Sequence, residues 1–197
     1  MRSRCAVALL AVSSFAAGIP AAAPAFAKAD AYKVDPVHTF VTFRIGHLGV
    51  GSVHGRFNET SGTVQYDAAD PAACSVQIEV KAASVDTGVA KRDDHLRSPD
   101  FLNVAQFPTI SFKSTAVKKV DGAHVEVTGD LTIHGTTKSV TVTMTVGGPK
   151  EDPWKKQRMG FEGTFTIKRA DYGVVGMPEP GNEEVRLTIA VEATKEP

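Results

Sequence analysis

Strict alternation of apolar and polar residues, repeated along several short segments, constrains the fold of this chain more than any other feature. In one segment Val76, Ile78 and Val80 alternate with polar residues. Period two places successive side chains on opposite faces of a β-strand. The pattern predicts about eight strands, at residues 41–45, near 57–64, and at 76–81, 110–113, 125–133, 140–146, 161–167 and 185–192.

The connections between these segments favour antiparallel pairing of neighbours. Turn signals such as Asp121-Gly122 and His134-Gly135 link consecutive strands over short distances. No helical pattern of about 10 to 15 residues lies between strands, which argues against a parallel α/β sheet. Eight amphipathic strands bury their apolar faces either by closing into one barrel or by stacking as two sheets.

Two stretches lack the alternation. Residues 87–108 contain Ser98-Pro99-Asp100, which resembles a helix start with an N-cap, a first-position proline and an acid in the first turn. We therefore expect a short helical lid within residues 92–106, beginning near Ser98 and covering one end of the strands with its apolar side. The Gly- and Pro-rich stretch 169–182 is expected to be a long connection or part of the rim.

The N-terminus has the organisation of a secretory signal peptide. Arg2 and Arg4 precede an apolar run, and Ala25-Phe26-Ala27 forms the small-x-small cleavage pattern. The alternative, a membrane span, requires roughly 20 apolar residues, and here Gly18 and Pro20 interrupt a shorter run. We predict Sec-dependent export to the periplasm with cleavage after Ala27, leaving one domain at residues 28–197 with no integral membrane span.

The charge balance argues against two classes of binding partner, and the cysteine content excludes a disulfide within the mature chain. Without the signal, 20 basic residues face 22 acidic ones. This near-neutral balance argues against nucleic acid as a partner and against strong binding to anionic membranes. Cys74 is then the only cysteine, so no intramolecular disulfide forms and the core must rely on packing.

Several motifs, spread across nearly the whole mature chain, resemble those of the YceI-like family. They are Val34-Asp35 with His38, FRIGHLGVGSVHGRF at 43–57, SVDTG at 84–88, RDDHLRSPDFLNVAQFP at 92–108, GDLTIHGTTK at 129–138, RADYG at 169–173 and EEVRLTI at 183–189. Asn103 stands where the family often has Asp, and the stretches 148–156 and 176–182 look individual to this protein. True lipocalins carry a Gly-x-Trp signature near the first strand, whereas Trp154 lies far along this chain.

The resemblance implies an eight-stranded antiparallel up-and-down barrel, lipocalin-like, that binds a polyisoprenoid or related lipid in an apolar tunnel. It implies no catalytic residues and no cofactor other than the bound lipid. Gly55, Gly129 and Gly163 share the inward parity and mark either barrel curvature or space for a ligand. The predicted lumen site comprises Val41, Phe43, Ile45, His47, Phe57, Ile78, Leu96, Phe101, Phe112, Met144, Phe161 and Phe165.

The titratable residues leave two alternatives. The six histidines include no HxH or HExxH pair, so we predict no metal site. His47 has the parity of the lumen residues and either hydrogen-bonds a ligand head group or is a satisfied core histidine. The charged cluster at residues 92–97 lacks an accompanying nucleophile motif. It is interpreted as structural, against the alternative of an enzyme acting on a lipid head group at the barrel mouth.

The primary hypothesis is therefore a periplasmic carrier or sequestering protein for a long apolar lipid: a polyisoprenoid, a quinone tail or a fatty acyl amide. A third hypothesis makes the barrel a scaffold whose 148–156 loop meets a membrane redox partner such as a cytochrome. Association of two copies of the chain into a homodimer is a further prediction.

Overall fold

The computed structural model describes residues 29–197, and nearly all of its regular structure is β. The predicted signal peptide lies outside the described residues. The strands are β1 (Asp30–Val34), β2 (Phe40–His47), β3 (Gly51–Phe57), β4 (Thr60–Tyr66), β5 (Ser75–Lys81), β6 (Val85–Asp86), β7 (Thr109–Lys119), β8 (His124–Ile133), β9 (Thr136–Glu151), β10 (Gln157–Lys168) and β11 (Glu184–Lys195). One α-helix, α1 (Ala90–Arg97), and three short 3-10 helices, η1 (Pro71–Ala73), η2 (Ala82–Ser84) and η3 (Arg169–Tyr172), complete the fold.

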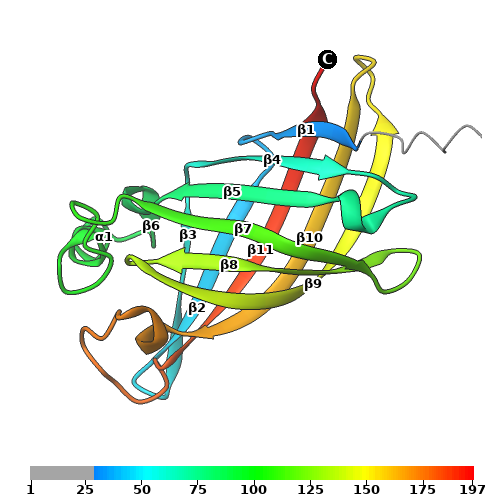
Figure 1. The fold of residues 1–197 in the computed structure, drawn as a ribbon. Coiled ribbons are helices and arrows are strands. Elements are labelled where there is room, and N and C mark those ends of the chain that lie inside the picture. The colour runs from blue at the N-terminus through cyan, green and yellow to red at the C-terminus, as the bar shows by residue number, and fades with distance from the viewer. Residues whose placement is uncertain (1–28) are drawn as a thin grey trace, which may run out of the picture.

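These eleven strands form one closed antiparallel barrel with eight positions around its circumference (Figure 1). Three positions hold two strands each, end to end: β1 continues as β2, β3 as β4, and β5 as β6. The register shows this directly, because β1 and β2 pair with successive parts of β11, while β2 pairs with β3 and β1 with β4. The predicted eight-stranded up-and-down barrel is confirmed, with three of its strands broken.

The breaks are held by backbone contacts between neighbouring positions. The amide of Asp35 donates to the carbonyl of Glu192, the amide of Asn58 to that of Ser84, and the amide of Ala82 to that of Pro108. These three backbone amides therefore find acceptors in the neighbouring position of the barrel. The breaks bend the wall without opening it.

The helix prediction was right in existence and wrong in position. α1 spans Ala90–Arg97, and Ser98, where we expected the helix to begin, is its C-cap. The Ser98 hydroxyl donates to the carbonyl of His95, one of the last carbonyls of the helix. Proline is common just after a helix as well as at its first position, so Pro99 marks the end here. Turns follow as far as Phe107, and the helix lies at one end of the barrel (Figure 1).

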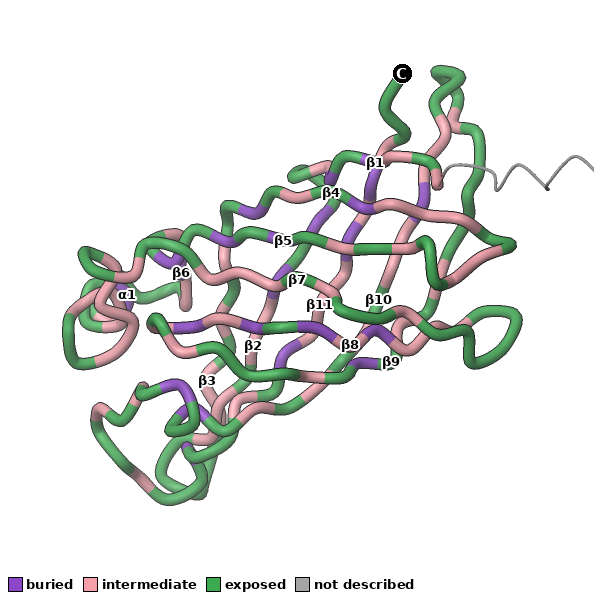
Figure 2. Tube along the Cα trace, viewed as in Figure 1, coloured by how far each residue is buried: buried purple, intermediate pink, exposed green. Residues whose placement is uncertain are grey.

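Buried residues alternate with more exposed ones along several strands, as predicted (Figure 2). Three packed clusters form around Ile78 and Val80, around Tyr32 and Met159, and around Leu131 and Tyr172. Two of these clusters include residues of β1, and the third packs along another part of the wall. The rest of the interior stays open.

Candidate functional site

The barrel encloses an apolar cavity of about 910 Å³. Every strand except β1 contributes side chains to its lining, and so does α1. We call the end beside α1 the α1 end, and the end formed by the β7–β8 and β9–β10 turns the hairpin end (Figure 1). Lining residues come from both ends, so the cavity runs along the barrel as a tunnel. Its volume lies near the upper limit of the roughly 300–1000 Å³ usual for small-molecule sites.

The structure brings all of the predicted lumen residues together around this cavity. The strand residues lie along its wall, His47 lies at the α1 end, and Leu96 and Phe101 face it from α1 and the turns after it. Phe43 and Phe57 pack with their ring centroids 5.8 Å apart. Contact of these residues with a ligand stays a prediction.

The inward-facing glycines shape the wall. A Cβ atom at Gly55 would overlap the ring of Phe43, and one at Gly129 would overlap the ring of Phe112. At Gly163 it would overlap the sulfur of Met144. The space left by each glycine is therefore taken by a large neighbouring side chain that lies back against the wall. The glycines keep the tunnel open indirectly, since these side chains would otherwise extend toward the axis.

Sequence reasoning missed several lining residues that share the same parity. Val127 and Val142 are directly paired across β8 and β9 and both face the cavity. Extending the alternation along each strand would have found them. Leu102 and Met177 also line the α1 end, but they lie in irregular segments that carry no periodic signal.

The polar groups along the tunnel are uncharged at neutral pH or lie at its ends. Burial raises the pKa of the Cys74 thiol and of the phenols of Tyr66 and Tyr172, which keeps all three protonated. The Cys74 sulfur is held by the backbone of Asp67, accepting from its amide at 3.3 Å. An apolar middle with polar ends suits an elongated molecule with an apolar chain.

The charged cluster of residues 92–97 ties α1 to the barrel. The buried Asp93 carboxylate accepts hydrogen bonds from the amide and the hydroxyl of Thr87. Arg92 donates to the hydroxyl and the carbonyl of the same residue, at 2.7 and 2.9 Å. Arg97 donates to the carbonyls of Ala83 and Val85. These contacts agree with the structural interpretation of the cluster.

A buried arginine that the sequence did not reveal organises the rim of the α1 end. Arg169 is 8% exposed and donates to the carbonyls of Val174, Gly176, Met177 and Asn182 and to the Asn182 side chain. The guanidinium group has five N–H donors, whereas an ammonium has three, so this one side chain satisfies four loop carbonyls and the Asn182 amide oxygen. The predicted rim segment 169–182 is thus shaped around one side chain.

One group of potential metal ligands occurs among the described residues: Asp35, His38 and Glu192. Arg158 already binds both carboxylates, donating to Asp35 at 2.8 Å and to Glu192 at 2.7 Å, and it also binds Asp152. Hydrogen bonds from His38 and Arg158 lower the pKa of the Asp35 carboxyl to about 2. The group therefore functions as an ion-pair network beside the β1–β2 break.

Within residues 29–197, no helix is both long enough and apolar enough to cross a bilayer. The homodimer and the cytochrome partner stay predictions.

Comparisons with known proteins agree with the barrel fold and identify the family of this chain. Protein YceI of Escherichia coli O157:H7 is 44% identical over 167 residues, covering 84% of this chain and 87% of that protein. The crystal structure of Burkholderia cenocepacia BcnA is similar with a TM-score of 0.74 at 28% identity, covering 82% of this chain and 99% of BcnA. A polyisoprenoid binding domain from Saccharophagus degradans has a TM-score of 0.69, covers 85% of this chain and 99% of its own, and at 17% identity shares the fold alone. A family model described as the YceI-like domain matches residues 32–193, and the chain therefore belongs to the YceI-like family.

Proposed function

We propose that this protein binds a long apolar lipid in its barrel and carries or sequesters it in the periplasm. The observation that carries the proposal is the apolar cavity of about 910 Å³ running between the two ends of the barrel. A side-chain-filled barrel would have no such space. The name of the Saccharophagus degradans domain, polyisoprenoid binding, points to an isoprenoid chain as the first ligand to test.

The driving force for such a ligand is apolar burial. Each methylene moved from water into the tunnel contributes about 0.8 kcal/mol, before the cost of immobilising the chain. The polar ends add hydrogen-bonding groups where a head group would lie, and His47 at the α1 end is our candidate for that contact. Quinones and polyprenyl lipids share this form, and so does a fatty acyl amide.

Catalysis at the barrel mouth has weaker support. An acid–base pair acting on a head group needs groups free to exchange protons with it. The acid–base candidates of the 92–97 cluster, Asp94 and His95, are instead engaged with Arg97 and Asp100. Asp93 and Arg92 are held by Thr87. We therefore propose a binding protein with no catalytic residues.

The experiment that tests the proposal is native mass spectrometry of protein purified from the periplasm without detergent. Organic extraction then identifies the cargo. We expect one bound species of isoprenoid mass, and uptake of an added quinone or polyprenyl lipid by the delipidated protein. Empty protein that also refuses these lipids would overturn the proposal. The same spectra test export, since cleavage after Ala27 leaves Lys28 as the first residue.

A further inference from the structure

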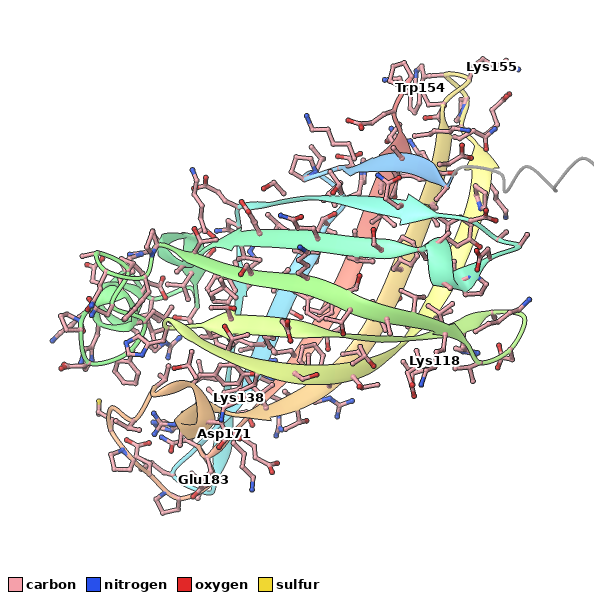
Figure 3. All side chains as sticks on the ribbon, in the orientation of Figure 1. Lys118, Lys138, Trp154, Lys155, Asp171 and Glu183 are labelled. Carbon is pink, nitrogen blue, oxygen red and sulfur yellow. The ribbon has the colours of Figure 1, made fainter. Side chains whose placement is uncertain are left out.

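We infer that the β9–β10 turn is a membrane anchor, which inserts Trp154 into the interfacial region of a phospholipid bilayer and holds the hairpin end of the tunnel against it. The inference rests on the proposed function, since a lipid carrier must exchange its cargo with a membrane. Trp154 is 75% exposed. Figure 3 shows Trp154 and Lys155 at the outer tip of the turn, away from the barrel wall.

Hydrogen bonds to Asp152 fix the backbone of the turn that carries Trp154. Both carboxylate oxygens of Asp152 are engaged: one accepts from the amides of Trp154 and Lys156, each at 2.9 Å, and the other accepts from Arg158 at 2.7 Å. Arg158 is anchored in turn by Asp35 and Glu192. A turn whose backbone is already ordered loses little backbone entropy when it binds. An exposed tryptophan held in this way suits an interaction surface better than a mobile loop would.

The charges around Trp154 complement an anionic surface. Residues 150–156 contain three lysines and two acids. Asp152 is bound by Arg158, which also binds Asp35 and Glu192, and Lys155 pairs with Glu151 at 3.0 Å. The ion pairs formed between described residues include none for Lys150 or Lys156, so both remain available to lipid phosphates. Tryptophan flanked by lysine is typical of the membrane–water interface.

The turn is too narrow to favour a protein partner. A stable protein–protein interface buries roughly 800 Å² on each side, whereas Trp154 is the one large hydrophobic side chain exposed in this turn. A bilayer needs no matching pocket, because it accepts one amphipathic ring and its flanking charges. Gly148, at the base of the same hairpin, lines the cavity, so docking by the tip would place that tunnel mouth close to the lipid.

The chain offers its own reporter, because Trp154 is its only tryptophan. Delipidated full-length mature protein is mixed with vesicles of equimolar phosphatidylglycerol and phosphatidylcholine, or of phosphatidylcholine alone. We expect a blue shift of the tryptophan emission, quenching by brominated phosphatidylcholine, and weaker binding to the uncharged vesicles and at high salt. Vesicle binding without any change in emission would overturn the inference, and so would no binding to either vesicle.

Variants identify the face that docks, with co-sedimentation as the readout. Trp154→Ala should weaken binding on the order of tenfold or more. Lys150→Gln with Lys156→Gln should weaken it about 25-fold, at about fivefold for each charge near an anionic surface. The matched control is Val50→Ala at the α1 end, where Val50 is 88% exposed, and we expect it to bind like the wild type. Loss of binding in Val50→Ala with retention in Trp154→Ala would overturn the inference.

Lipid loading separates this inference from the proposed function. We expect Trp154→Ala to take up a polyprenyl lipid normally from a cyclodextrin complex but slowly from vesicles. Equal rates from vesicles for Trp154→Ala and the wild type would overturn the anchor. Wild-type protein that docks yet takes up no lipid from either source would refute the lumen as a lipid site while leaving the anchor intact.

Discussion

Replacing Val142 with tryptophan should obstruct the tunnel and weaken lipid binding about a thousandfold. Val142 lies in the middle of β9, faces the cavity and pairs with Val127. Both valines are buried, yet neither belongs to the three packed clusters. An indole at residue 142 therefore extends into open space rather than into packed side chains.

The magnitude follows from the number of ligand carbon atoms that the indole displaces from the cavity. A water-sized group occupies about 30 Å³, so about 910 Å³ holds on the order of 30 such groups. If the indole excludes about five carbon atoms of the ligand, the lost burial is about 4 kcal/mol, or about a thousandfold in Kd. The open lumen should keep the overpacking cost near 1 kcal/mol, the lower limit of its usual range, which lowers the Tm by about 2–4 °C.

The assay is titration of delipidated protein with a polyprenyl lipid, followed by native mass spectrometry. The matched control is Thr143→Trp, because the next residue along β9 is exposed on the outer wall. We expect the control to bind like the wild type. If both variants bind with wild-type affinity while keeping their fold, the ligand does not occupy the lumen and the reasoning is refuted.

Three further outcomes are expected. Across a series of prenyl lipids of increasing length, the affinity should rise about fourfold per buried carbon and then level off when the tunnel is full. Calorimetric titration measures this, and an affinity that does not depend on chain length would contradict binding in the lumen. Arg169→Lys should lose part of the hydrogen bonds to the rim carbonyls and lower the free energy of unfolding by about 1–3 kcal/mol. Urea unfolding measures this loss, and amide hydrogen exchange at residues 174–182 should become faster. Unchanged exchange at these residues would argue against this role of Arg169. Asp35→Asn should cost about 1 kcal/mol at neutral pH after solvent screening. Because the pKa of Asp35 is lowered to about 2, its contribution is full above the ordinary value near 3.9 and is lost as the pH falls toward 2, so the two proteins should converge in acid; a constant difference in Tm would contradict this.

The walls of the barrel could be predicted from the sequence because each strand carries its own signal. Period two separates inward Val142 from outward Thr143 without any knowledge of the neighbouring strands. The same signal placed Phe43 and Phe112 on the inner wall. Their rotation back over Gly55 and Gly129 was not predictable, since it depends on which residues pair across strands.

The remaining features depend on contacts between distant parts of the chain. The β3–β4 break at Asn58 is held by Ser84, and the segment around Phe57 and Val64 gave no local sign of two strands. Strand β1 is short and went unnoticed. The start of α1 was misplaced because Pro99 is compatible with both ends of a helix. A buried arginine such as Arg169, satisfied by loop carbonyls, leaves no periodic pattern to read.

Closure of the barrel by its last strand has a consequence for how the protein folds. β11 pairs with both β1 and β2, so the register joins Tyr32 to Lys195 and Val41 to Ile189. Pairings this distant in sequence carry a large loop-closure entropy, and chains dominated by them fold slowly. No enclosed lumen can form until the C-terminal residues are available. The growing chain therefore keeps unpaired edges at β1 and β2 until β11 has been synthesised.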